Sequence, residues 1–271
     1  MKIGIYTNLL KDSYKHSSKK VIDYLTKQNI KYRFLNEEYN FDGLDYVIIL
    51  GGDGTLLSIS KDIAKSNLPV LCINTGTLGF LTEYEDNEIE EAIELLKSQD
   101  FVIDTREFLE ASCGENNINA LNEIVISRQY SENSVNVIIR FEVYANEKLV
   151  DKYVADGIIV STPTGSTAYS LSAGGSILTP DLNGFILTPV APHSLQSRPI
   201  VVSNNTEIKI VIKSVQCSQG LFADGKHVTS LKSDDVIIVK KSNLKINFIR
   251  KKDFNFFNRL QYKFSKWNET K

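Results

Sequence analysis

Along the first 105 residues, short apolar runs alternate with segments whose apolar residues fall at helical spacing. The run from Tyr46 to Leu50 is continuous and rich in β-branched residues, which is typical of a strand buried on both faces of a parallel sheet. Alternating strands and helices predict an open, mostly parallel α/β sheet with helices on both faces. We expect its other strands at 2–6, 32–35 and 69–73, and its helices around 21–25, 56–63 and 89–96.

From about residue 106 the apolar period changes to two. Short alternating segments separated by turn residues predict a sandwich-like β domain with little helix. Further strands are expected at 207–213 and 236–239, and residues 254–267 return to helical spacing. The predicted organisation is an α/β domain over 1–105, a β domain over 106–250 and a helix within 251–271. The alternation is clearest at Val135, Val137, Ile139, Phe141 and Val143.

Composition changes this picture little. The 271 residues are 42% hydrophobic and 24% charged with a formal net charge of −2, so no strong field points to nucleic acid or an anionic membrane. The first residues lack the apolar region of a signal peptide, and no stretch approaches the roughly 20 apolar residues of a membrane span. Cys72, Cys113 and Cys217 are far apart, and no histidines stand at metal-ligand spacing. We therefore expect reduced thiols, no metal site built from side chains and a cytoplasmic location.

The first candidate for chemistry is the glycine loop from Gly51 to Thr55, which follows the buried strand and precedes a helix. Ligands of open α/β sheets bind beyond the carboxyl ends of the strands, where glycines and a helix N-terminus suit a phosphate. The loop is neither a Walker motif nor a G-x-G-x-x-G motif. Asp53 can accept a hydroxyl proton or hold a phosphate-bound metal. The alternative is a tight turn in which this aspartate caps the helix.

Three further segments carry candidate chemistry. The glycine-rich stretch 74–81 follows the next strand, so it should line the same edge of the sheet. Asn122 and Glu123 precede an apolar run; a carboxamide beside a carboxylate can bind a base edge and a ribose, although the pair alone is better explained as a surface turn. Residues 156–175 lead from a short buried strand through a dense cluster of hydroxyls to two glycines. Small hydroxyls there can hydrogen-bond a sugar, and Tyr169 can stack on a heterocycle.

Together these motifs resemble the bacterial NAD kinase family, from Gly51 to the turn at Asp224 and Gly225. The Gly-Gly-Asp-Gly motif alone is shared with phosphofructokinases and with diacylglycerol and sphingosine kinases. The Asn-Glu pair and the stretch 156–175 narrow the resemblance to NAD kinases. It implies transfer of the ATP γ-phosphoryl group, or of polyphosphate in some members, to the 2′-hydroxyl of the NAD adenosine ribose. The product is NADP, and a divalent metal, normally Mg²⁺, is required.

The resemblance also implies roles for individual residues. Asp53 matches the family's proton acceptor, with Gly54 beside it in the NAD and phosphate site, and Asn122 and Glu123 match the pair that holds the adenosine. Val154 and Lys226 depart from the family pattern, in which a basic side chain and a glutamine are frequent at these positions. The remaining dinucleotide contacts match Asp156, Thr167, Ala168, Tyr169, Ser170, Leu171, Ser172 and Ala191, and weaker candidates are Gly51, Gly52, Thr55, Asn74 and Lys226.

The resemblance further implies a homodimer or homotetramer, in which the last helix returns to the first domain and a neighbouring subunit can complete the NAD site. Two other functions stay open on the residues alone. A lipid or sugar kinase would share the glycine loop, although the sequence shows no apolar groove for a lipid. A non-catalytic dinucleotide sensor would bind NAD without needing the carboxylate of Asp53. We expect no nucleic acid or membrane partner.

Overall fold

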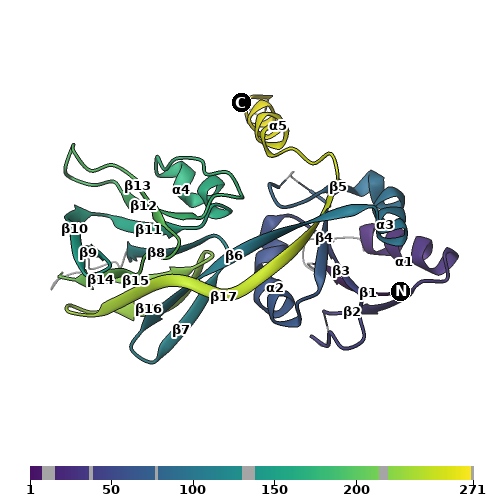
Figure 1. Cartoon of the computed structure of the whole chain (residues 1–271), viewed down its shortest axis with the longest axis horizontal. Coiled ribbons are helices and arrows are strands. Elements are labelled where there is room, and N and C mark those ends of the chain that lie inside the picture. The colour runs from purple at the N-terminus through teal and green to yellow at the C-terminus, as the bar shows by residue number, and fades with distance from the viewer. Residues whose placement is uncertain (8–15, 37–38, 77–78, 130–137, 214–218, 270–271) are drawn as a thin grey trace. The chain divides into compact units, whose positions relative to one another are not determined.

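The computed structural model describes residues 1–7, 16–36, 39–76, 79–129, 138–213 and 219–269, with side chains described as far as residue 266. These residues form two compact units (Figure 1). Unit 1 comprises Met1–Arg106 together with Lys245–Lys271, and unit 2 comprises Glu107–Leu244. Val135, Val137, Cys217 and positions 77–78 of the second glycine-rich stretch lie outside the described residues.

Unit 1 is built on a parallel sheet with the strand order β2-β1-β3-β4, so the predicted α/β fold is confirmed. β17 (Val236–Lys251) continues the sheet, because its residues Asn247 and Phe248 run parallel to the start of β4. The other strands of this sheet are β1 (Lys2–Thr7), β2 (Lys31–Phe34), β3 (Tyr46–Leu50), β4 (Pro69–Asn74) and β5 (Tyr84–Glu85).

Helices cover both faces of this sheet (Figure 1). α1 (His16–Lys27) and α3 (Ile89–Ser98) share a core with Ile48 and Leu50 of β3. α2 (Asp53–Ser66) contacts β3 and β4, and the alternate residues Val47 and Ile49 are also fully buried, so α2 covers the opposite face. α5 (Phe256–Glu269) and the short η1 (Asp86–Glu88) belong to the same unit. No helix in the described part of the chain could span a membrane.

Unit 2 is a β sandwich, as the period of two predicts. One sheet has six antiparallel strands in the order β13-β12-β11-β8-β15-β16, and the other contains β10-β9-β14 and the first residues of β17. Ile158 and Val160 of the first sheet share a core with Phe141 and Val143 of the second. β6 (Phe101–Cys113) begins in unit 1 and continues into unit 2. The other strands of unit 2 are β7 (Asn116–Ala120), β8 (Glu123–Arg128), β9 (Ile139–Ala145), β10 (Lys148–Ala155), β11 (Gly157–Ser161), β12 (Gly184–Val190), β13 (Ile200–Ser203), β14 (Ile208–Ile212), β15 (Gln219–Ala223) and β16 (Lys226–Leu231).

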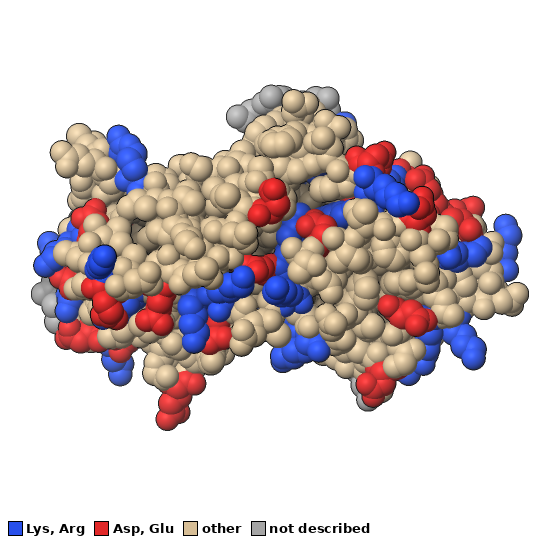
Figure 2. Space-filling view, in the orientation of Figure 1, with Lys and Arg blue, Asp and Glu red and all other residues tan. Residues whose placement is uncertain are grey.

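β17 is much longer than the strand expected at 236–239, because it extends to Lys251. Its first residues pair with β14 in unit 2 and its last with β4 in unit 1. Lys240 and Lys241 interrupt the apolar alternation, which hides this continuation in the sequence. On the face drawn in Figure 2, basic and acidic side chains are interspersed among the described residues.

Candidate active site

The glycine loop turns the chain from β3 into α2. The N–H of Gly51 donates to the carbonyl oxygen of Ile73 at 3.0 Å, which ties the loop to β4. Gly51 has a φ of 151°, and a Cβ at this position would lie 2.4 Å from Thr55 Oγ1. A glycine is therefore required here. Gly52 is the N-cap of α2 and offers no side-chain cap, so the first N–H groups of the helix remain available to an anion.

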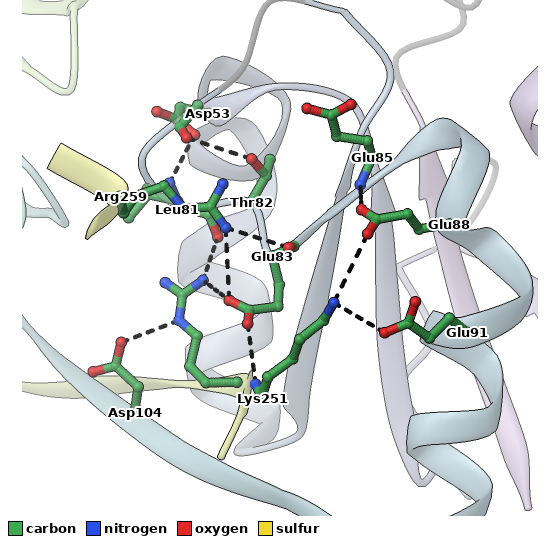
Figure 3. Close-up of polar contacts among 12 residues, drawn as sticks. Asp53, Leu81, Thr82, Glu83, Glu85, Glu88, Glu91, Asp104, Lys251 and Arg259 are labelled. Atoms are coloured by element: carbon green, nitrogen blue, oxygen red, sulfur yellow. Dashed lines mark hydrogen bonds and ion pairs between the residues drawn. The ribbon is translucent and has the colours of Figure 1, made fainter. Parts of the chain in front are cut away.

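Asp53 is the first residue of α2 and does not cap it, which excludes the helix-cap alternative. Its carboxylate accepts the N–H of Phe80 at 2.9 Å on Oδ2 and the N–H of Leu81 at 3.1 Å on Oδ1. The bond to Leu81 is drawn in Figure 3. A Cβ at Gly79 would lie 1.9 Å from Asp53 Oδ1. The second glycine-rich stretch therefore receives this carboxylate, and Gly79 makes the close approach possible. Gly54, next in the helix, is exposed, and a Cβ there would meet nothing within 4 Å.

Asn74 shapes the start of that second stretch. Its side-chain amide donates to the carbonyl oxygen of Gly76 at 2.8 Å, and its Oδ1 accepts the N–H of the same residue at 3.3 Å. Asn74 and Thr55 are both buried, with 5% of their surface exposed. The structure thus brings Gly51, Gly52, Asp53, Gly54, Thr55 and Asn74 together at one edge of the sheet of unit 1.

In unit 2, Asn122 and Glu123 stand at the start of β8, where the carboxylate of Asp224 holds their backbone. Asp224 Oδ1 accepts the N–H of Asn122 at 2.8 Å and that of Glu123 at 3.2 Å, and Oδ2 accepts the N–H of Leu121 at 2.9 Å. Asp224 adopts a φ of 47° at the turn into β16. It brings a second carboxylate close to that of Glu123, about 100 residues away in the chain.

The side chains of this pair are buried and incompletely bonded. Burial, and then the charge of Asp224, raises the pKa of Glu123 to about 8. Asn122 Oδ1 and Glu123 Oε2 are buried, and neither has a hydrogen-bond partner among the described residues. Buried polar atoms of this kind are rare without a partner, which makes the pair a candidate for ligand binding.

The hydroxyl-rich segment packs directly against this pair. The N–H of Thr162 donates to the carbonyl oxygen of Asn122 at 2.9 Å, and a Cβ at Gly165 would lie 2.2 Å from that same oxygen. η2 (Gly165–Thr167) and α4 (Tyr169–Ser172) follow. Ser170 is used within the fold, because its hydroxyl bonds that of Thr188 at 2.8 Å. Tyr169 and Ser172 are exposed, and Thr167, Ala168 and Leu171 are half-buried.

A third group of predicted residues lies where β10 leads into β11. Asp156 forms an ion pair with Arg128 at 3.0 Å, and its N–H donates to the carbonyl oxygen of Val190 at 2.9 Å. Ala191, which follows Val190, has a φ of 44°. The carbonyl oxygen of Val154 accepts the N–H of His193 at 2.9 Å. The structure therefore brings Val154, Asp156 and Ala191 into one neighbourhood of unit 2.

Comparison with known proteins identifies the family of the chain. The ATP-NAD kinase N-terminal domain matches residues 3–101, and the ATP-NAD kinase C-terminal domain matches residues 121–251. The chain belongs to the NAD kinase family. An NAD kinase of Thermoanaerobacter sp. (strain X514) is 37% identical over 282 residues, which cover 97% of this chain and 98% of that protein.

Solved structures of NAD kinases and related enzymes share the fold. The yeast NADH kinase complexed with NADH matches with a TM-score of 0.82 at 25% identity, over 96% of this chain and 86% of that one. An NAD kinase from Archaeoglobus fulgidus in complex with ATP matches with a TM-score of 0.78 at 27% identity, over 97% of this chain and 98% of that one.

Two basic side chains of α5, which the sequence patterns do not single out, lie beside the second glycine-rich stretch of this NAD kinase family member. Arg259 and Lys263 are four residues apart and share a helix face. Arg259 Nη2 donates to the carbonyl oxygen of Glu83 at 3.3 Å, and Lys263 Nζ lies 5.7 Å from the centre of the Phe80 ring. Burial lowers the pKa of both side chains, and the charge of Asp53 opposes this effect. The helical spacing was visible in the sequence, but its docking site was not.

Lys226 differs from the frequent glutamine of the family and lies at the start of β16, just after the turn that holds Asp224. It is exposed. In the sequence, Asp224 is recognisable only as part of a turn. The signal that could have found its role is weak, because an Asp-Gly pair is most often a simple turn.

Proposed function

We propose that this chain transfers the γ-phosphoryl group of ATP to the 2′-hydroxyl of the adenosine ribose of NAD, with Asp53 as proton acceptor. The observation that carries the proposal is the Asp53 carboxylate, held by two backbone N–H groups beside the uncapped N-terminus of α2. The NAD kinases that match almost the whole chain support the choice of acceptor. The ATP complex of the archaeal relative supports the choice of donor.

In this reaction a bond forms between the 2′-oxygen and the γ-phosphorus, the bond to the β-phosphate oxygen breaks, and ADP leaves. Each Asp53 oxygen accepts one N–H and keeps lone pairs for the hydroxyl proton. The hydroxyl becomes acidic only as its oxygen bonds to phosphorus, so the carboxylate takes the proton late. Phosphoryl transfer otherwise demands positioning and charge balance.

Charge balance comes from several groups near Asp53. The N-terminus of α2 and the cations of Arg259 and Lys263 are suited to the phosphates of the donor. The described residues include no group of three or more His, Cys, Asp or Glu side chains that could hold a metal ion. A Mg²⁺ ion would be held by phosphate oxygens of the donor beside the Asp53 carboxylate, and it would neutralise phosphate charge there.

Asn122 and Glu123 are proposed to hold the adenosine of NAD, because each presents a buried oxygen without a partner among the described residues. The exposed and half-buried residues of 167–172, with Val154, Asp156 and Ala191, are proposed to contact the rest of the dinucleotide. We also propose that the protein assembles as a homodimer or homotetramer.

The test is an assay with NAD, ATP and Mg²⁺, read by an NADP-specific dehydrogenase. We expect turnover for the wild type and a loss of about 10²- to 10⁴-fold in kcat for Asp53→Asn. Asp62→Asn is the matched control, since Asp62 lies on the same helix, is partly exposed and pairs with Lys65 at 3.9 Å.

Near-normal turnover of a folded Asp53→Asn protein would show that the base role is wrong. Absence of NADP together with turnover of diacylglycerol or a sugar phosphate would favour the lipid or sugar kinase. Calorimetric NAD binding without turnover across several metals and donors would favour the sensor.

A further inference from the structure

Arg250, near the end of β17, is one of the most buried charged residues in unit 1, with 1% of its side chain exposed. Its Nη1 donates to the carbonyl oxygen of Leu81 at 3.1 Å and to Glu83 Oε2 at 3.0 Å, and its Nε donates to Asp104 Oδ2 at 3.2 Å. The guanidinium also lies over the ring of Phe254, 4.7 Å from its centre. An arginine is almost never buried to this extent unless its charge is paired.

Leu81 links this arginine to the proposed proton acceptor. Its N–H binds Asp53 Oδ1, and its carbonyl oxygen binds Arg250 Nη1 (Figure 3). A single residue is therefore held from both sides, by the carboxylate through its N–H and by the guanidinium through its oxygen. A shift of Leu81 changes the direction in which its N–H points at Asp53.

Glu83 holds the next part of the same loop. Its Oε1 accepts the N–H of Lys251 at 3.0 Å, and its own N–H donates to the carbonyl oxygen of Cys72 in β4 at 2.8 Å. Its Oε2 binds Arg250. The segment from Gly79 to Glu83 is thus attached to β4 and β17 at Leu81 and Glu83, directly after the two N–H groups that bind Asp53.

We propose that Arg250, through Leu81 and Glu83, is a positioning residue that fixes the orientation of the Asp53 carboxylate for proton transfer. The proposal rests on the proposed role of Asp53 as proton acceptor. Arg250 is buried and directed into the loop, so it acts on the rate of the chemical step rather than on substrate affinity. Its partner Asp104 also binds Arg106.

The test is a double-mutant cycle between Arg250→Lys and Asp53→Asn. Lysine keeps the positive charge but replaces the planar guanidinium, in which Nη1 binds the loop and Nε binds Asp104, with a single nitrogen that cannot hold both sides in the same geometry. We expect Arg250→Lys to lower kcat by about 10- to 100-fold, because displacements near 1 Å cost about that much, with little change in KM for NAD. In the Asp53→Asn background the same substitution should have no further effect on kcat, since the group that it positions is gone.

Arg106→Lys is the matched control. Arg106 is 5% exposed and binds the same Asp104 carboxylate at 2.6 and 2.5 Å. Its conservative substitution should leave kcat within about twofold while perturbing the same ion-pair network. Melting temperatures of all variants separate loss of fold from loss of rate. Glu83→Gln, which weakens the same attachment, replaces Arg250→Lys if that variant does not fold.

Three results would overturn the positioning role: unchanged kcat in Arg250→Lys, an equal loss in Arg106→Lys, or an equal loss of kcat with and without the Asp53 carboxylate. These outcomes differ from failure of the proposed function. If Asp53→Asn alone keeps wild-type turnover, the proton-acceptor role fails whatever Arg250 does. If Asp53→Asn is inactive and Arg250→Lys is normal, only the positioning role fails.

Discussion

Substitution of Gly79 by alanine tests the geometry of the candidate site most directly. The added Cβ would lie 1.9 Å from Asp53 Oδ1 and 2.6 Å from Asp53 Cγ, whereas real Cβ atoms essentially never approach other atoms closer than 3.0 Å. Relief of the clash at Oδ1 requires a movement of at least the difference between 3.0 and 1.9 Å, which is about 1.1 Å. Gly79 is not among the glycines with positive φ, so backbone strain adds nothing to this effect.

A displacement of about 1 Å at a catalytic group lowers rates by about 100-fold, and we expect that loss in kcat for Gly79→Ala. Gly76→Ala is the matched control, because Gly76 lies in the same glycine-rich stretch and a Cβ there would meet nothing within 4 Å. This control should keep kcat within about twofold of the wild type. Both variants are assayed for NADP formation with saturating NAD, ATP and Mg²⁺, and their melting temperatures are compared.

The double variant Asp53→Ala/Gly79→Ala isolates the cause. If the clash with the carboxylate is what matters, alanine at 79 lowers the melting temperature in the wild-type background and has little effect once the carboxylate is removed. Wild-type turnover of Gly79→Ala, or an equal loss of stability in both backgrounds, would refute the reasoning.

Three further predictions concern ionisable groups. Glu123 has a pKa of about 8 in the folded protein against an ordinary 4.5, so the folded state retains a proton that the unfolded state releases between these values. The free energy of unfolding should therefore fall with rising pH in this window, relative to Glu123→Gln, by up to about 1.4 kcal/mol per pH unit; parallel profiles from urea unfolding would contradict this. Asp224→Asn removes the second cause of the raised pKa of Glu123, so the upper pH limit of this fall in stability should move to lower pH. An unchanged upper limit would show that the charge of Asp224 does not contribute to that pKa. Lys263→Met keeps the packing over Phe80 but loses the cation, and should raise KM for ATP or lower kcat by about 10-fold with KM for NAD unchanged; unaltered ATP kinetics would remove Lys263 from the phosphate site.

The fold class could be predicted because each unit has a strong local period. The continuous run Tyr46 to Leu50 is buried on both faces in the structure, as such a run predicts for a central parallel strand. The extension of β17 beyond Val239 could not be predicted in this way. Its continuation contains Lys240 and Lys241, and it remains a strand because its later residues pair with β4. Strand length here depends on partners rather than on local propensity.

The candidate site was predictable where its residues are adjacent in sequence and not where they are distant. The glycine loop at Gly51 was recognisable with its strand and helix. Taken alone, the sequence around Asn122 and Glu123 is better explained as a surface turn, and what distinguishes the pair structurally is Asp224, about 100 residues later. Its carboxylate gathers the backbone N–H groups of both residues and contributes to the raised pKa of Glu123. No pattern within either segment contains that information.

The structure gives Gly76 and Gly79 different reasons for being glycines. The sequence suggests that both serve a ligand shared with the first loop. In the structure a side chain at Gly76 would meet open space, whereas one at Gly79 would collide with Asp53. Gly79 is therefore required by a carboxylate of the same chain, and the N–H groups that follow it bind that carboxylate. The second loop therefore binds the carboxylate of the first loop, so its sequence is constrained by the position of that loop, and this constraint becomes visible only when both loops are placed in space.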